Sequence, residues 1–598
     1  MRSAEQILGI IRERGKRGLP LEDIYRQLYN PSLYLMAYAR LYSNEGAMTR
    51  GTTSETVDAM ALKKIELLID DLRHERFRWT PVRRTYIEKK NGKLRPLGIP
   101  TWTDKLLQEA IRLLLEAYYE PQFSPHSHGF RPDRGCHTAL RKMEQTWTGT
   151  KWWIEGDVAQ CFDRLDHQVL VNILREKLHD NRFIQLIQWL LEAGYLEEWR
   201  YHPTLSGSPQ GGVVSPILSN IYLDQLDAYV ERELLPAYTR GEKRQRNPEY
   251  NRLRVREQYY RKQGNREKAL ELRRQRQQLP ERDPLDPHYR RLRFVRYADD
   301  FCLGFAGPQE EAAEIKQHLK AFLQEQLKLE LSEEKTLITH ASTQPARFLG
   351  YELMVQYRDD KRDHTDRRCI NGHVGLRIPG KVIENKCALY MQRGKSHHRA
   401  ELLNDDDFSI IAHYQSEYRG FVQYYLLAQN VSWLWKLHWV MRASLLKTLA
   451  HKHRSSVSKM ARKYRAMIET PHGQMKCLEK VVLREGKKPL VARFGGIPLR
   501  RQTLVTLTDQ LVPLQKRPAR NELLKRLLAD TCELCKSTHQ VEVHHIRKLA
   551  DLQRPGRVDK PLWVRVMAAR RRKTLIVCRE CHRAIHVGRP TRKPPGQQ

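Results

Sequence analysis

The stretch RYADDFCLGF, residues 296–305, places two adjacent acids, Asp299 and Asp300, between apolar runs that are typical of β-strands. Neighbouring carboxylates repel each other, so such a pair favours either a bound cation or open water. One interpretation is a solvated Asp-Asp turn. The other is a metal site, which requires a further carboxylate at the end of a neighbouring strand.

The stretch WWIEGDVAQCFD, residues 152–163, supplies that carboxylate, because Asp157 ends an apolar strand pattern. Two divalent ions about 4 Å apart, held by such carboxylates, can bind the attacking and leaving oxygens of a phosphoryl transfer. Carboxylate and water ligands suit Mg²⁺ better than softer metals. The sequence therefore predicts a Mg²⁺ site made of Asp157, Asp299 and Asp300.

Charge is the strongest global signal in the chain. Its 598 residues include 106 Lys and Arg against 70 Asp and Glu, which gives a net charge of +36. Such an excess favours a large RNA or DNA partner, bound in a salt-dependent way. Membrane phosphates are the weaker alternative. The length indicates about three or four domains, and the lack of a long apolar segment predicts a cytoplasmic protein.

Two long segments have distinctive compositions. Residues 240–282 are highly charged, which favours a solvated helix, with a basic helical insertion that touches nucleic acid as the alternative. Residues 383–470 have a helical and aromatic pattern. Most of these aromatic side chains are expected in a core, with basic residues on the other faces.

The last 70 residues contain two Cys-x-x-Cys pairs, in CELC (532–535) and IVCRECHRAIH (576–586). This spacing predicts a tetrahedral zinc site made of Cys532, Cys535, Cys578 and Cys581. A small module has little core, so a structural metal is physically sensible. Disulfides are the alternative, which a reducing cytoplasm disfavours.

The blocks around these residues resemble a known family. YADD (297–300) and DVAQCFD (157–163) are similar to the palm of a reverse transcriptase, and further blocks are similar to group II intron-encoded proteins from about residue 20 to the C-terminus. The stretch IIAHYQSEYRGFVQYYLLAQN resembles the maturase (X) domain of that family. The other blocks are NPSLYLMAYARLYSNEGAMTRG, KKNGKLRPLGIPTWTDKLLQEA, SHGFRPDRGCHTAL, SGSPQGGVVSPILSNIYLDQLD, LKLELSEEKTLITH and ARFLGYEL.

The resemblance implies roles for the palm residues. Asp157, Asp299 and Asp300 are implied to be the catalytic metal ligands, with Asp157 and Asp299 the stronger direct ligands. Phe162, five residues after Asp157, is implied to lie beneath the incoming sugar, where its ring would exclude a 2′-hydroxyl by volume. Simple core packing is the alternative for Phe162.

The resemblance also implies a nucleotide-binding set. Lys89 and Arg95 flank a predicted Asn-Gly hairpin turn and are implied to bind triphosphate oxygens. Lys90 and Lys93 are alternatives for the lysine. Gln210, in the motif SPQGG, is implied to lie next to the nucleotide.

The histidines of the tail resemble the HNH nuclease motif, a ββα-metal fold. His544, His582 and His586 are implied to hold one divalent ion, with Mg²⁺ expected, and His545 to act as the general base that activates water. The alternative is a structural zinc finger whose histidines contact DNA phosphates. The Asn expected in the motif falls near Lys573, which leaves the orientation of His545 open.

These observations predict a multidomain α+β protein: a right-hand polymerase with fingers and palm, an α-helical thumb or maturase domain, and a small ββα-metal HNH zinc module. The expected boundaries are 1–355 for the reverse transcriptase with a basic insertion at about 240–290, 356–385 for a linker, 386–490 for the maturase and thumb, 491–530 for a DNA-binding (D) region, and 531–598 for the endonuclease.

The resemblance implies three activities: RNA-directed DNA polymerisation, assistance to intron splicing, and nicking of the second target strand for target-primed reverse transcription (retrohoming). The implied partners are group II intron RNA, target DNA and deoxynucleotides, with a homodimer left open and no membrane. The protein is expected in a bacterial cytoplasm, nucleoid-associated during insertion. A non-enzymatic maturase and another type of bacterial reverse transcriptase are the alternatives.

Overall fold

The computed structural model describes most of the chain. The described residues are 2–88, 92, 94–198, 200–202, 204, 207, 211–284, 286–358, 361, 364, 370–484, 487–505, 507, 521–549, 552, 560–570 and 572–592. A helix that could span a bilayer is absent from these residues. The nucleotide-binding candidates Lys89 and Gln210, the alternative lysines Lys90 and Lys93, and residues 506 and 508–520 of the expected D region lie outside them.

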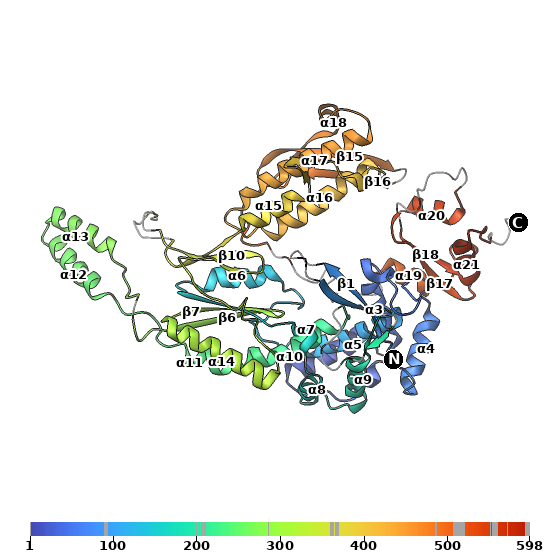
Figure 1. Ribbon diagram of the computed structural model, residues 1–598, viewed down its shortest axis with the longest axis horizontal. Coiled ribbons are helices and arrows are strands. Elements are labelled where there is room, and N and C mark those ends of the chain that lie inside the picture. The colour runs from blue at the N-terminus through green and yellow to red at the C-terminus, as the bar shows by residue number, and fades with distance from the viewer. Residues whose placement is uncertain are drawn as a thin grey trace.

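The elements fall into four consecutive regions (Figure 1). The first holds α1 (Ala4–Lys16), α2 (Ile24–Gln27), α3 (Pro31–Leu41), η1 (Glu45–Met48), α4 (Leu62–Arg73), β1 (Val82–Glu88), β2 (Leu94–Ile99) and α5 (Trp102–Tyr119). The second holds α6 (Cys136–Thr146), β3 (Trp152–Asp157), α7 (Cys161–Arg164), α8 (His167–Arg175), α9 (Asn181–Glu192), β4 (Tyr195–Glu197), β5 (Arg200–His202), α10 (Ser215–Tyr229), η2 (Val230–Leu234), α11 (Leu235–Ala237), α12 (Pro248–Lys262), α13 (Arg266–Gln278), β6 (Arg291–Tyr297), β7 (Asp300–Ala306), α14 (Gln309–Leu327), β8 (Ile338–His340), β9 (Ala346–Phe348), β10 (Tyr351–Gln356) and β11 (His373–Arg377).

The third region follows the sheets, and the fourth forms the C-terminal module. The third holds α15 (Gly380–Ala388), β12 (Met391–Gln392), β13 (Lys395–Ser396), η3 (Ala400–Leu402), α16 (Asp407–Tyr424), η4 (Val431–Leu434), α17 (Trp435–Lys452), α18 (Val457–Tyr464), β14 (Arg465–Thr470), β15 (Gly473–Arg484) and β16 (Lys487–Gly495). The fourth holds α19 (Glu522–Leu528), β17 (Val541–His545), α20 (Leu562–Arg570), β18 (Thr574–Cys578) and α21 (Arg579–Val587).

A four-stranded antiparallel sheet in the order β6-β7-β3-β8 lies at the centre of the molecule. Both of its faces are covered, which explains the unbroken apolar runs in these strands. Phe294 and Leu303 join a core with α10 and α14, whereas Val295 and Cys302 join a second core with α6. These helices lie on opposite sides of the sheet (Figure 1).

The second core joins this sheet to the third region. It contains Trp153 of β3, Leu353 of β10 and Tyr414 of α16. Part of the expected linker, 356–385, is therefore a strand, because β11 pairs with β10. Beyond α18, the chain forms the three-stranded sheet β14-β15-β16, which the helical interpretation of this region did not anticipate.

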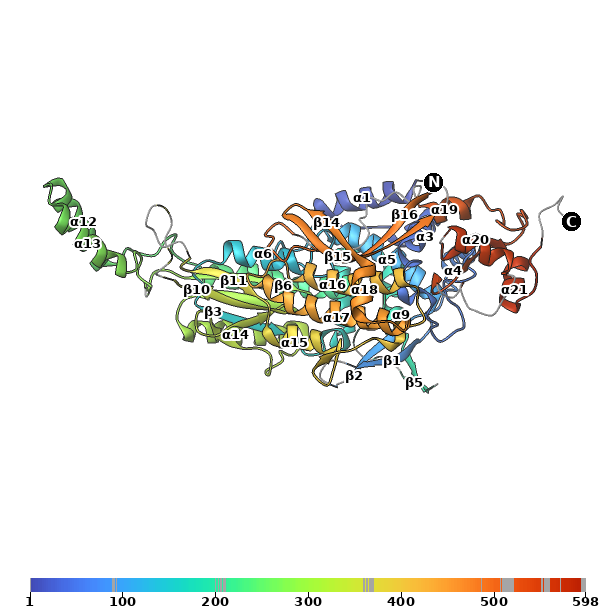
Figure 2. The same ribbon diagram turned by 90° about the horizontal axis from the view of Figure 1, so that it is seen from above.

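The basic insertion forms two helices, α12 and α13, that pack against each other. This hairpin projects from one end of the molecule, whereas the C-terminal module lies at the other end (Figures 1 and 2). Among its helical residues, Ala269 and Leu272 are the buried ones. Most charged side chains of the hairpin face solvent, as the solvated-helix interpretation predicts.

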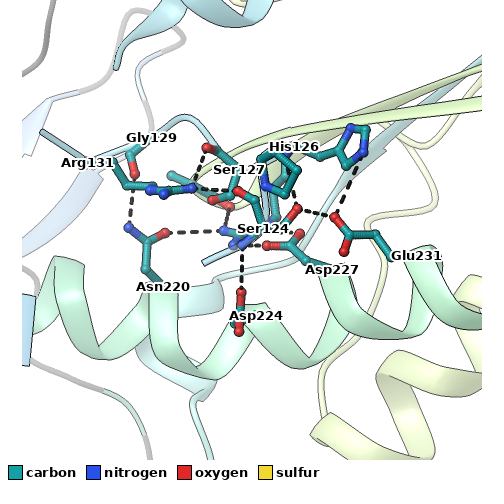
Figure 3. A network of polar contacts seen from close by, with 12 residues as sticks. Ser124, His126, Ser127, Gly129, Arg131, Asn220, Asp224, Asp227 and Glu231 are labelled. Atoms are coloured by element: carbon teal, nitrogen blue, oxygen red, sulfur yellow. Dashed lines mark hydrogen bonds and ion pairs between the residues drawn. The ribbon is translucent and has the colours of Figure 1, made fainter. Parts of the chain in front are cut away.

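Arg296, which precedes the paired acids, is a buried cation that anchors the β6–β7 hairpin. Its guanidinium donates to both carboxylate oxygens of Asp227 on α10, at 2.7 and 2.5 Å, and to the carbonyl oxygen of Ala298 at 2.8 Å. The same face of α10 carries Asn220 and Asp224, which contact the segment from Ser124 to Arg131 (Figure 3). This network fixes the hairpin relative to α10.

Replacing Arg296 by Met is expected to destabilise the reverse transcriptase region by about 3–5 kcal/mol, because Asp227 would remain buried without its partner. The side chains are 1% and 0% exposed, so water cannot replace the lost contact. Chemical denaturation measures the change. Lys320→Met is the matched control: its ion pair with Glu333 is 44% and 61% exposed, and its loss is expected to cost about 0–1 kcal/mol. Equal effects of the two variants would refute the anchoring role.

Candidate functional site

The three predicted metal-binding acids converge at one end of the central sheet. Asp157, the last residue of β3, lies directly opposite Asp300, the first residue of β7. Asp299 occupies the turn between β6 and β7. The strand register therefore brings together acids that are more than 140 residues apart in sequence, as the metal interpretation requires.

The electrostatics of this cluster favour a cation. Burial, then the charge of Asp299 and contact with Asp157, raises the pKa of Asp300 to about 7. Burial, and then repulsion from Asp157, also raises the pKa of Asp299. The positive charges of Arg95 and Lys335 lower this pKa, but they only partly offset the increase. Lys335 donates to Asp157 Oδ2 at 2.7 Å. Repelling carboxylates of this kind fit a divalent ion, which would remove the repulsion.

The turn that carries Asp299 is packed closely against its neighbours. Ala298 has a φ of 54°, which is unusual for a residue with a side chain. A Cβ atom on Gly129, in the SHGF block, would lie 2.4 Å from the Ala298 nitrogen. Only glycine allows this approach. The backbone of the SHGF block at Gly129 therefore packs directly against the turn that carries Asp299.

Two of the other predicted polymerase residues, Phe162 and Arg95, lie near this end of the sheet. Phe162 lies on α7, where its half-buried ring contacts Phe130 edge-to-face at 6.3 Å between centroids. Arg95 lies on β2, close enough to Asp299 to influence its pKa. Gly211 of the SPQGG motif has a φ of 106°, and a Cβ there would lie 2.7 Å from the Gly98 carbonyl oxygen on β2. The motif backbone thus approaches the β1–β2 hairpin.

The four cysteines of the C-terminal module form one cluster. Cys532, Cys535, Cys578 and Cys581 are all buried, and their sulfur atoms lie within 4.8 Å of one another. The sulfurs of Cys535 and Cys578 are 3.6 Å apart, close to the roughly 3.8 Å edge of a tetrahedron with 2.3 Å Zn–S bonds. These sulfurs also form part of the small core of the module. The donor set fits a structural metal.

A second cluster contains the three histidines implied as ligands. His544 lies on β17, and His582 and His586 lie one turn apart on α21. His582 Nε2 is 3.1 Å from His544 Nδ1 and 3.0 Å from His586 Nε2. Ligands at adjacent positions of an octahedral ion with 2.1 Å bonds are about 3.0 Å apart. The convergence of these nitrogens fits a divalent ion.

Glu542 orients one ring of this cluster. Its Oε1 lies 2.6 Å from His582 Nδ1, which leaves His582 Nε2 facing the other histidines. Burial disfavours charge on His582, but hydrogen bonds with Asp58 and Glu542 raise its pKa to about 9. Carboxylate–histidine pairs of this kind hold metal-binding rings in place.

The structure places His545 away from this cluster. Adjacent residues of a strand point to opposite faces, and the His545 ring is buried with its Nε2 3.0 Å from the Tyr38 hydroxyl on α3. Burial lowers the pKa of His545 to about 4. Lys573, aligned with the expected Asn, accepts a backbone hydrogen bond from Ile546 through its carbonyl oxygen.

Several residues of these sites were not identified from the sequence. Asp58, from the loop before α4, joins the histidine cluster, and Lys335 contacts Asp157. Asp227 pairs with Arg296. Asp58 lies in the ordinary polar stretch SETVDAM, so no local signal could have found it.

The comparisons with known proteins agree with this geometry. The reverse transcriptase (RNA-dependent DNA polymerase) family matches residues 87–255 and 265–353, the type II intron maturase family matches 377–495, and the AI2M/AI1M-like HNH endonuclease family matches 532–582. The chain is 40% identical to the group II intron-encoded protein LtrA of Lactococcus lactis subsp. cremoris, over 94% of this chain and 95% of LtrA. It is 33% identical to an uncharacterized 91 kDa protein in the cob intron of Schizosaccharomyces pombe, over 95% and 70% of the two chains.

The fold and sites thus define a reverse transcriptase joined to maturase and HNH endonuclease domains. The chain belongs to the group II intron-encoded proteins. This confirms the family expected from the sequence blocks and the expected combination of enzymatic domains. The two alternatives, a non-enzymatic maturase and a different bacterial reverse transcriptase, do not account for the combination of the three domains.

Proposed function

We propose that the protein copies its intron RNA into a target DNA by target-primed reverse transcription. The observation that carries this proposal is the register that places Asp157 opposite Asp300 beside Asp299. The intron RNA would insert into one DNA strand, the endonuclease would nick the other, and the exposed 3′ end would serve as the primer. A right-hand arrangement, with the helices after β11 as a thumb, is part of this proposal.

The polymerase proposal assigns a role to each residue near the carboxylates. Asp157, Asp299 and Asp300 would hold Mg²⁺, which when bound activates the primer 3′-hydroxyl and neutralises pyrophosphate. Arg95 would bind triphosphate oxygens, and Phe162 would exclude the 2′-hydroxyl by volume. Lys335 would release Asp157 when the cation arrives, because both compete for the same carboxylate oxygens. Lys89 and Gln210 remain proposed nucleotide-binding residues on the family pattern.

The nuclease proposal rests on the C-terminal module. β17 pairs antiparallel with β18 and α21 follows, an order that supports a ββα-metal assignment. The four cysteines would hold zinc, and His544, His582 and His586 would hold Mg²⁺. His545 remains the proposed base, and its ring would have to leave Tyr38 to reach a water molecule at the cation.

The maturase proposal rests on an exposed aromatic surface of the third region. Trp435 and Trp439 lie one turn apart on α17 and are 60% and 62% exposed, and the exposed Lys436 and Arg442 lie beside them. Exposed aromatic rings among basic side chains favour stacking on unpaired RNA bases next to phosphates. This face would bind intron RNA and support its splicing-competent fold.

Replacing Trp435 and Trp439 by Ala is expected to weaken the affinity for intron RNA by about 1–3 kcal/mol per stacked base. The fold should stay intact because both rings are exposed. Filter binding at several salt concentrations measures the affinity, which should fall steeply with salt in every variant. Trp189→Ala is the control, since this tryptophan is 37% exposed but lies on α9, away from the proposed surface on α17. An unchanged affinity of the double variant would refute the proposed surface.

A further inference from the structure

Asp58 belongs to the N-terminal region, yet its carboxylate lies in the histidine cluster of the C-terminal module. Its Oδ2 is 2.9 Å from His586 Nε2, and its Oδ1 is 3.2 Å from His582 Nε2 and 3.6 Å from His544 Nδ1. One ligand atom from each of these four residues lies within 4.8 Å of the others. The four residues therefore surround one point.

The backbone around Asp58 is held in place by β17. Val543 donates to the Met60 carbonyl oxygen at 2.9 Å and accepts from the Ala59 nitrogen at 3.0 Å. The His545 nitrogen donates to Asp58 Oδ1 at 2.8 Å. Ala59 has a φ of 59°, a strained value that needs support from surrounding contacts. Residues 58–60 therefore lie along the edge of β17 and are hydrogen-bonded to it.

Apolar packing joins the same two regions. Leu523 and Leu527 of α19 and Val543 of β17 are buried in the large core that also contains Tyr34 and Tyr38 of α3. The module is thus docked on the reverse transcriptase region by a core as well as by Asp58. Figure 1 shows the module beside α3 and α4 at this end of the molecule.

We propose that Asp58 is the fourth protein ligand of the endonuclease cation, so that this metal centre is shared between the two regions. The inference rests on the proposed cation site of the three histidines. A carboxylate oxygen is a hard donor that suits Mg²⁺ or Mn²⁺. Four protein donors still leave two positions of an octahedral ion for water or a DNA phosphate oxygen. Asp58 also supplies the negative charge that three neutral imidazoles lack.

A shared ligand links cation binding to docking of the module. If docking strengthens cation binding, bound cation must strengthen docking by the same factor. Loss of the Asp58 carboxylate should therefore lower cation affinity and also loosen the edge between residues 58–60 and β17.

The test measures Mn²⁺ binding to the full-length chain by the electron paramagnetic resonance signal of free Mn²⁺. Asp299→Asn and Asp300→Asn are present throughout, so that the polymerase site does not take up the ion. Asp58→Asn is expected to lower the affinity by about tenfold or more, and His586→Ala to lower it at least as much. Asp70→Asn is the matched control, because it removes the same charge from an exposed position on α4; its affinity should not change.

Hydrogen exchange of the Ala59 and Val543 amides provides the second readout. Added Mn²⁺ should slow this exchange in the otherwise unchanged chain and leave it unaffected in Asp58→Asn. Wild-type affinity in Asp58→Asn, with affinity lost in His586→Ala, would overturn the shared centre but keep the histidine site. Wild-type affinity in both variants would overturn the proposed nuclease cation site itself. Tighter binding in Asp58→Asn would show that the carboxylate blocks the ion, which also overturns the inference.

Discussion

Replacing Asp299 and Asp300 together by Asn is expected to reduce primer extension by at least about a thousandfold, which corresponds to about 4 kcal/mol of transition-state stabilisation. Asp157 would remain, but one carboxylate cannot hold two ions in line with the reacting oxygens. Stability should stay the same or rise, because the change removes two desolvated carboxylates that repel Asp157. Single-nucleotide extension on a supplied primer and template measures the rate, and thermal denaturation measures the stability.

Phe162→Val is the matched control for this experiment, since it changes the same site without removing a metal ligand. It should retain extension with deoxynucleotides and raise kcat/KM for ribonucleotides relative to deoxynucleotides. An unchanged ratio would show that the ring serves only in packing. Extension at the original rate by the double Asn variant would refute the assignment of the carboxylates.

Cys532→Ser is expected to release the metal of the cysteine cluster and to unfold the C-terminal module. The four cysteines make up a large part of the small module core, so the binding free energy of the metal is also folding free energy. Mass spectrometry under native conditions measures bound zinc per chain. Limited proteolysis measures the folding of residues 521–592, and a labelled duplex target reports nicking, which should be lost.

His586→Ala separates the two metal centres of the module. The His586 side chain is 55% exposed, so its removal should leave the fold and the cysteine-bound metal intact while nicking falls sharply. Primer extension on a supplied primer should be normal in both variants. Loss of zinc from His586→Ala would contradict two separate centres. Nicking at the original rate would mean that the histidines only contact DNA.

Local spacing explains why the cysteine cluster and the palm acids could be predicted. Each Cys-x-x-Cys pair places two sulfur atoms on one turn of the chain. The fold then has only to bring the two pairs together to complete the cluster. Asp157 and Asp300 each lie at the end of an apolar strand pattern, and strand pairing aligns such ends. Neighbouring residues in sequence therefore carried most of the information needed for these sites.

Other features had no comparable signal. The sheet β14-β15-β16 lies largely in the expected α-helical maturase and thumb domain, 386–490, but only β14 falls within the aromatic segment 383–470 that favoured helices. Apolar composition alone does not separate a buried strand from a buried helix. The sequence also left open which way the His545 side chain points. Its neighbour His544 faces the cluster, and strand alternation turns the His545 ring toward Tyr38.

The sequence by itself determined the family, and it predicted the palm carboxylates and the four cysteines, because these depend on short motifs and on acids at the ends of apolar strand patterns. Tertiary structure alone decided that Arg296 is neutralised by Asp227 and that Asp58 reaches the histidines of the module. Asp58 and His586 are 528 residues apart, and no periodicity or motif connects them. They meet because apolar packing of α19 and β17 on α3 fixes the position of the module, and a contact of that kind depends on how whole surfaces fit together.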